Sequence, residues 1–247
     1  MDLKLVNPQA KYAKITLIDP PPLGYIHLAA AVDPPPGPTP IPGRSRRKAA
    51  LLIRLRSLAR QLETLTTVES ASVYHAILIA PPAGFTKAGT HVARYDVVAL
   101  IETTSPEVLG EVQGTEPYRL LVEAVTEAAT DVHVMTARCP KRVGEVDKTR
   151  QGLFLFNYFV ADDAAVALQL WEHLAGWYAV ETGLELHAPG AARGRRLRLC
   201  QPRTLGRQPA ALPAPSAEQA QLPHLPTACR HGRAASVSSG VKRWTQR

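Results

Sequence analysis

The sequence contains three cysteines, no long apolar run and none of the short motifs that mark the common catalytic sites. Because Cys139, Cys200 and Cys229 stand far apart, they predict neither a disulfide framework nor a paired-cysteine metal site. No apolar stretch approaches the roughly 18 residues that a membrane span needs. The first residues lack the apolar core of a secretory signal. We therefore expect a cytoplasmic protein that does not enter a membrane.

The motifs that usually reveal a cofactor or a nucleophile are absent as well. The chain has no GxGxxG or P-loop for a nucleotide and no GxSxG for a catalytic serine. It has no HxxxH, no clustered pair of carboxylates and no Cys/His cluster with the spacing of metal ligands. The sequence therefore predicts no metal site and leaves open whether the protein is an enzyme.

The net charge of +8 belongs to one part of the chain. Residues 185–247 carry 11 Lys and Arg against 2 acidic residues, a net charge of +9. Residues 1–184 carry 18 basic and 19 acidic residues, a net charge of −1. The basic character therefore indicates no binding face on the body of the protein.

The order of apolar patterns predicts a ferredoxin-like α+β domain over 24–137. Runs rich in β-branched and apolar residues predict four strands, and apolar residues spaced at three and four positions predict two helices. Ser45 is expected to cap the first helix, and Gly114 and Pro117 to interrupt the second. The expected strands are 25–32, 72–80, 94–103 and 131–137, and the expected helices are 45–65 and one that begins at Pro106. This β-α-β-β-α-β order places both helices on one face of a four-stranded antiparallel sheet.

The other face of this sheet is also largely apolar, so it must be covered. Residues 153–160 predict a fifth strand, and a helix follows that Asp162 or Asp163 caps and Gly183 ends. This strand and helix are typical of the start of a second ferredoxin-like copy. The expected organisation is a leader (1–23), the ferredoxin-like domain (24–137), a linker (138–152), a partial second repeat (153–184) and a tail (185–247).

A ferredoxin-like unit that buries its open sheet face on another copy resembles the dimeric α/β-barrel superfamily, here of the tandem-repeat type with the second repeat truncated. The likeness is carried by the element order over 24–137, the segment TEPYRLLVEAV (Thr115–Val125) and the restart at 153–184. Members of that superfamily hold small apolar or aromatic molecules between sheet and helices. They include haem-degrading and cofactor-independent monooxygenases, dye-decolorising peroxidases and isomerases. The resemblance implies a small-molecule-binding protein and, if it is an enzyme, a monooxygenase-like oxidoreductase.

Residues 185–247 depart from that pattern, because a second repeat would continue with strand, strand, helix and strand. The segment is dense in Pro, Arg, Ala and Gly, and it is too poor in bulky apolar residues to offset its ordering entropy. Two interpretations stay open: a disordered basic tail, or an out-of-frame translation of the rest of the repeat. The abrupt change at Leu184 favours the second.

Polar side chains on otherwise apolar strands are the candidate ligand-pocket residues, because a buried amide or imidazole without a partner costs about 1–3 kcal/mol. A ligand is one reason to keep such groups, and pairing within the core is the alternative. Alternation along the strands places His27 and Asp96 on the face toward the second layer. The candidates are Tyr25, His27, His75, Asp96 and Asn157.

Asn157 lies on the first strand of a repeat, where haem-degrading members of the dimeric α/β-barrel superfamily keep an asparagine. Those enzymes also need a tryptophan and a histidine from later in the repeat, which here would fall in 185–247. No cofactor is therefore predicted, and haem is kept only as the less supported alternative. No catalytic residue is predicted either.

Four cations surround the start of the first predicted helix, where the helix dipole disfavours positive charge. They are Arg44, Arg46, Arg47 and Lys48. They are candidates for contact with an anionic ligand or partner, and a solvated helix end is the alternative. The run RGRRLR (Arg193–Arg198) would bind nucleic acid only non-specifically, because no aromatic residues are interleaved.

Three functions remain open from the sequence. The first is binding or oxygenation of a small apolar or aromatic molecule near His27, His75 and Asp96. The second is a non-enzymatic interaction or oligomerisation domain whose open sheet face pairs with another chain. The third, nucleic-acid association through the basic tail, is the least expected. A truncated second repeat also predicts self-association through the open sheet face, and no membrane partner is expected.

Overall fold

The computed structural model describes residues 15–36, 39–79, 92–142, 153–161, 164–182, 185–186, 197–199, 203–204 and 236–243. Most of the predicted leader, most of the predicted linker and most of 185–247 therefore lie outside the described residues. Within the described ranges, no helix combines the length and the apolar character needed to cross a membrane.

Four strands form the sheet that the sequence predicts. Their order, β4-β1-β3-β2, is that of a ferredoxin-like unit, and all three pairings are antiparallel. The strands are β1 (Gly24–Ala31), β2 (Val68–Ile79), β3 (Val97–Thr103) and β4 (Asp131–Arg138). β2 begins earlier than predicted because it continues through a register shift between Val68 and Ser70.

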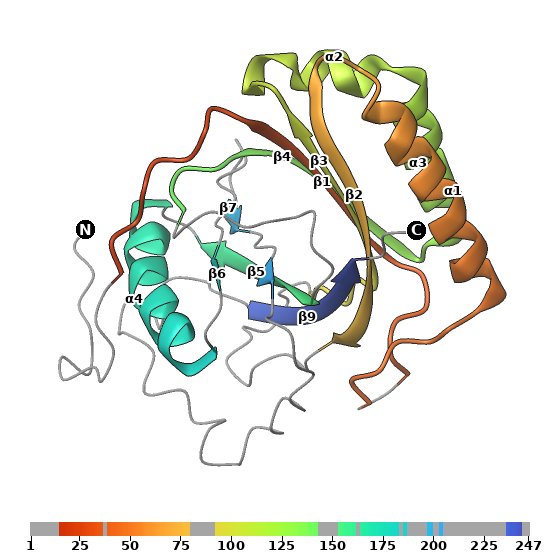
Figure 1. Cartoon of the computed structure of the whole chain (residues 1–247). Helices are drawn as coiled ribbons and strands as arrows, with labels where there is room; N and C mark the ends of the chain where they lie inside the picture. Colours follow the sequence, from red (N-terminus) through yellow and green to blue (C-terminus); the bar gives the residue numbers. More distant parts are fainter. Residues whose placement is uncertain are drawn as a thin grey trace.

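Helices α1 (Arg46–Leu62) and α3 (Glu116–Ala128) cover one face of this sheet (Figure 1). α1 begins where predicted, because the Ser45 side-chain oxygen accepts a hydrogen bond from the backbone N–H of Lys48 at 3.0 Å. Its leucine stripe is buried against the sheet, as the spacing of three and four predicts.

The second predicted helix is interrupted, as the glycine and proline in its sequence indicate. It consists of η1 (Pro106–Val108), α2 (Leu109–Gly114) and α3. Thr115 has an extended backbone at the break, with φ −73° and ψ 152°. Pro117 follows in the first turn of α3, where a residue without an N–H leaves no helical hydrogen bond unmade.

Apolar side chains fill both faces of the four-stranded sheet. On the helix side, alternate residues of β1 and β3 pack with the stripe of α1 and with α3. On the other side, the remaining alternate residues pack against aromatic side chains of β5 (Leu153–Ala161). We call this second face, which is turned away from α1 and α3, the inner face.

β5 and helix α4 (Ala164–Thr182) are the strand and helix predicted for 153–184. The sheet continues past β2 through β9 (Ser236–Arg243) to β5 and β7 (Leu197–Leu199), in the order β4-β1-β3-β2-β9-β5-β7. It curls so that β5 and β9 lie on the side of the inner face, with α4 beyond β5 (Figure 1). A strand of the same chain therefore covers the inner face.

Strands occur in 185–247 although the sequence predicts none there. β6 (Glu185–Leu186) pairs with β8 (Arg203–Thr204), β7 pairs with β5, and β9 pairs with both β2 and β5. The physical reason is the open backbone edges of β2 and β5, which an extended segment can pair with whatever its hydrophobicity. That the chain is out of frame beyond Leu184 stays a prediction.

Candidate ligand site on the inner face

Strand register gathers polar side chains at one end of the inner face. Tyr25 of β1 lies opposite Glu102 of β3. In the next row, His27 and Ser72 both lie opposite Leu100, whose side chain belongs to the inner core. Residues directly opposite each other in an antiparallel pair point to the same face. The four polar side chains therefore share the inner face.

His27 is enclosed at the centre of this group, with 2 % of its surface exposed. Its Nε2 lies 3.3 Å from the hydroxyl of Tyr158 on β5. The rings of Tyr158 and Phe156 flank the imidazole, with centroid distances of 5.6 and 5.9 Å. Its Nδ1 is buried and has no hydrogen-bond partner in the described part of the chain. In either tautomer, one hydrogen-bonding position of the imidazole is therefore left unfilled by the residues that the structure describes.

Burial also fixes the protonation state of this imidazole. Desolvation first, and the neighbouring His133 second, lower the pKa of His27 from 6.5 to about 3. The ring is therefore neutral at neutral pH. A group with so low a pKa is a poor general base, but it still accepts or donates a hydrogen bond.

Aromatic rings and small side chains make up the rest of the inner face. Tyr74 of β2 meets Phe154 of β5 edge to face, at a centroid distance of 5.1 Å. Tyr95 meets Tyr158 in the same manner at 5.4 Å, and it stacks on His133 at 6.2 Å with 13° between the planes. The small residues among these rings are Ala29, Ala31, Ala76, Ala93 and Ala137. Flat rings and small side chains suit a planar apolar molecule.

Asp96, which alternation predicts on the inner face, belongs to the helix side. Its carboxylate pairs with Lys48 Nζ of α1 at 2.7 Å and accepts hydrogen bonds from the backbone N–H groups of Val32 and Asp33, at 2.6 and 3.0 Å. The prediction fails because Asp96 precedes β3, so strand alternation does not reach it, and Tyr95 takes the inner-face position instead. Asp96 ties the loop after β1 to the start of α1.

The other predicted pocket residues are placed differently from one another. Tyr25 is half-buried and packs against the inner core. His75 lies opposite Val97, whose side chain belongs to the helix-side core, so register puts His75 on the face opposite His27. Asn157 lies on β5 as predicted, but its side chain lies outside the described residues. Of the predicted set, the structure therefore brings Tyr25 and His27 together on one face.

The four cations at the start of α1 also differ in their surroundings. Lys48 is buried in its ion pair, so it is not available to an external anion. Arg47 donates from a guanidinium nitrogen to the Val32 carbonyl oxygen at 2.8 Å. Arg44 and Arg46 are exposed. Contact with an anionic ligand or partner stays a prediction for these arginines.

The described residues contain no group of three or more side chains that could hold a metal ion. A haem would need an axial ligand with room beside it for the macrocycle. The two inner-face imidazoles, His27 and His133, each have a tyrosine ring against them, at 5.6 and 6.2 Å. The described part of the inner face therefore does not fit a haem.

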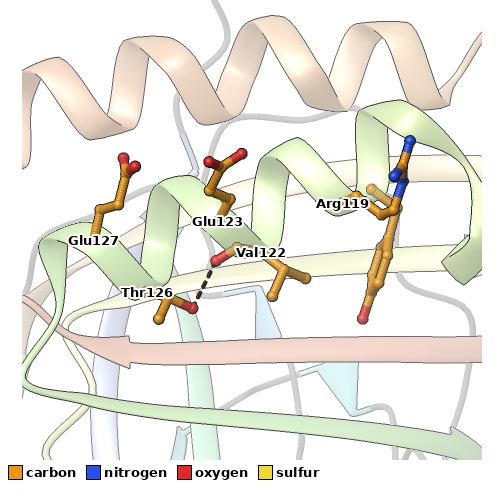
Figure 2. Close-up of a pocket in the computed structure, with 6 residues that line it drawn as sticks. Arg119, Val122, Glu123, Thr126 and Glu127 are labelled. Carbon is orange, nitrogen blue, oxygen red and sulfur yellow. Dashed lines mark hydrogen bonds between the residues drawn. The ribbon is translucent and has the colours of Figure 1, made fainter.

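A shallow, open hollow lies elsewhere, on the outer surface of α3 (Figure 2). Its lining comes from α3 alone, and there Thr126 Oγ1 donates to the Val122 carbonyl oxygen at 2.8 Å. Glu127 at this hollow pairs with Arg54 of α1 at 3.2 Å. The hollow is on the helix side of the protein, away from the inner-face residues.

Sequence reasoning missed several inner-face groups. Glu102 and Ser72 occupy inner-face positions of β3 and β2. The rule that selected His27, a polar side chain on an otherwise apolar strand, would have selected them too. His133 could have been found in the same way, because it alternates with the inner-face residue Met135. Tyr158 has no such signal, since its role depends on β5 covering the inner face.

Comparison with known proteins bears on the fold. No family profile matches the sequence, and no curated protein matches it significantly. Among solved structures, an anthrone oxidase-like protein is similar over 94 % of this chain and 96 % of its own, with 14 % identity and a TM-score of 0.57. A dye-decolorizing protein from V. cholerae is similar over 90 % of this chain and 95 % of its own, with 11 % identity and a TM-score of 0.43. The first similarity, together with the strand order, shows that the chain has a ferredoxin-like fold.

Proposed function

We propose that the protein binds a small aromatic molecule on the inner face, between the four-stranded sheet and β5, and oxidises it with O2 without a cofactor. The observation that carries this proposal is His27, a neutral, buried imidazole with an unfilled hydrogen-bonding position among aromatic rings. Leaving such a position unfilled costs about 1–3 kcal/mol. A hydroxyl or carbonyl group on a ligand would fill it, which gives the imidazole a purpose that packing alone does not.

This placement differs from the sequence-based expectation of a ligand between sheet and helices. Fully buried apolar side chains such as Leu55 and Leu121 line the helix side, and fully buried aromatic side chains such as Tyr74 line the inner face as well. Two buried polar atoms that have no hydrogen-bond partner in the described part of the chain, His27 Nδ1 and Ser72 Oγ, are on the inner face. Self-association through that sheet face and nucleic-acid binding by 185–247 stay predictions.

The similar solved structure of an anthrone oxidase-like protein supports anthrone as a first probe. In the overall reaction, anthrone and O2 give anthraquinone and water: the ring methylene loses two hydrogens and gains one oxygen atom, and the second oxygen atom leaves in water. The protein would hold the rings among Tyr74, Tyr95 and Phe156 and exclude water. His27 would hydrogen-bond the ligand oxygen and orient it, because its low pKa suits that role better than proton removal.

Binding and turnover of anthrone test the proposal separately. Calorimetric titration under nitrogen measures the dissociation constant, and the appearance of anthraquinone after admission of air measures turnover. We expect His27→Leu to weaken anthrone binding about tenfold, the value of one hydrogen bond in a buried site. His75→Leu, the same change on the helix side, should leave binding unaltered. Wild-type protein that does not bind anthrone, or a His27→Leu variant that binds it as tightly as wild type, would contradict the proposal.

A further inference from the structure

We propose that the protein forms a two-fold dimer through the outer surface of its helix layer, which consists of α1 and α3. Ile53 of each copy enters the hollow on α3 of the other copy, and arginines of α1 face glutamates of α3. The inner-face ligand site plays no part in this contact. Three features of the helix layer favour it: opposite charge on the two helices, an exposed isoleucine on α1 and a mostly apolar hollow on α3.

The two helices carry opposite charges although residues 1–184 as a whole are nearly neutral. α1 contains six basic residues and no acidic one, whereas α3 contains three glutamates and one arginine. The helices lie side by side, so the layer has a positive half and a negative half (Figure 1). A surface of this kind is complementary to a second copy of itself turned by 180°.

Ile53 stands between two arginines on the outward side of α1. Arg46, Ile53 and Arg60 are spaced by seven residues, so they follow one line along the helix, and all three are exposed. Ile53 is 66 % exposed, the largest value among the large apolar side chains that the structure describes. A single exposed isoleucine is common on protein surfaces, but the hollow on α3 offers this one a complementary site.

The hollow on α3 is apolar and bordered by negative charge. Its surface is mostly apolar, and the residues that line it include Val122, Glu123 and Glu127. The side chains of Glu123 and Glu127 point away from that of Val122 (Figure 2). An apolar side chain flanked by arginines therefore matches the hollow in both polarity and charge.

The directions of the helices agree with this pairing. β1 and β3 are antiparallel, and the helix after each strand returns along the sheet, so α1 and α3 run in opposite directions. A two-fold axis normal to the helix layer therefore lays α1 of one copy parallel to α3 of the other. With Ile53 level with Glu123, Arg46 comes level with Glu116, because each stands seven residues earlier on its helix.

A second copy suits this layer better than a nucleic acid does. A polyanion laid on α1 would also meet the carboxylates of α3, whereas a second copy pairs both halves of the layer at once. Two adjacent helices about 26 and 20 Å long offer roughly 500 Å² to a partner. Because a standard interface buries about 800 Å² per partner, we expect a weak dimer, with a dissociation constant on the order of 10 μM.

Sedimentation equilibrium from about 5 to 200 μM measures this dissociation constant. Ile53→Asp puts a carboxylate into an apolar hollow bordered by glutamates, so it should weaken the dimer at least about tenfold. Ile41→Asp is the matched control, because it makes the same change at an isoleucine that is 59 % exposed and lies in the loop before α1. It should leave the dissociation constant unaltered.

Exchange of charge between the helices tests the two-fold arrangement. One variant carries Arg46→Glu and Arg60→Glu, and a second carries Glu116→Arg and Glu123→Arg. Each alone should be monomeric, because α1 and α3 then face each other with like charge. An equimolar mixture should dimerise with about wild-type affinity, because each helix again faces the opposite charge, and this recovery shows that both variants are folded.

Wild-type protein that stays monomeric at about 200 μM overturns the inference. A wild-type dimer that Ile53→Asp leaves intact overturns it too, because another surface then holds the copies together. Charge variants that do not pair when mixed also overturn it. A labelled oligonucleotide that binds the monomeric wild type but not the Arg46→Glu, Arg60→Glu variant would assign α1 to nucleic acid instead.

Discussion

Lowering the pH should destabilise the protein through His27, because this imidazole is held neutral in the folded state. Burial first, and His133 second, lower its pKa from 6.5 to about 3. Between these values the unfolded chain binds a proton at His27 and the folded chain does not. Stability is therefore fully present above pH 6.5 and is lost as the pH falls from 6.5 toward 3.

The size of the effect follows from the same two pKa values. Each pH unit below the unfolded pKa removes about 1.4 kcal/mol from the free energy of unfolding. At pH 5 the loss is about 2 kcal/mol relative to pH 8, and near pH 3 it approaches about 5 kcal/mol. A loss of 2 kcal/mol is a large part of the 5–15 kcal/mol that is usual for a folded protein.

Urea unfolding of the wild type and of His27→Gln, at pH 8 and at pH 5, isolates this contribution. The packing cost of the substitution is the same at both pH values, and the two proteins share all other ionisable groups. The difference in free energy of unfolding between the two proteins therefore changes with pH through His27 alone. The wild type should lose about 2 kcal/mol more than His27→Gln between pH 8 and pH 5. Equal losses in the two proteins would refute the argument that His27 is a buried, neutral imidazole.

Three further substitutions test how the structure positions the inner face. Lys48→Met leaves the fully buried Asp96 carboxylate without its cation, so the free energy of unfolding should fall by about 3–5 kcal/mol. If urea denaturation shows a fall of less than about 1 kcal/mol, the ion pair is not formed as described. Ser45→Ala removes the cap of α1 and should cost about 1 kcal/mol by the same assay, and an unchanged midpoint would argue that the cap is not formed. In Gly24→Ala the new Cβ would meet the Ser105 carbonyl oxygen at 2.8 Å, so thermal unfolding should occur at a lower temperature than in wild type, and an equal or higher midpoint would show that this close approach is wrong.

The order of elements could be predicted from sequence because each signal is local. The leucine stripe and Ser45 define α1, and the break at Thr115 follows from Gly114 and Pro117. The strands of 185–247 could not be predicted, because they pair with the open edges of β2 and β5 rather than follow a pattern of their own. Edge pairing depends on the tertiary arrangement and leaves little trace in a single sequence.

The candidate site was predictable only in part. The rarity of an imidazole on an apolar strand indicated His27, and alternation put it on the correct face. The same rule put Asp96 on the wrong face, because Asp96 precedes β3 and does not follow the alternation of that strand. Tyr158 depends on the packing of β5 over a sheet that is distant in sequence, and no local pattern encodes that contact.

The central claim is that a ligand hydrogen-bonds to His27 on the inner face. The most direct test is an NMR titration of isotope-labelled histidine with 2-naphthol, observing the ring nitrogens of His27 and, as the control on the opposite face, His75. We predict that the Nδ1 resonance of His27 shifts on saturation, as its unfilled position gains a partner, while the His75 resonances stay in place. Binding of 2-naphthol that leaves the His27 resonances unmoved, or that moves those of His75 instead, would contradict the account.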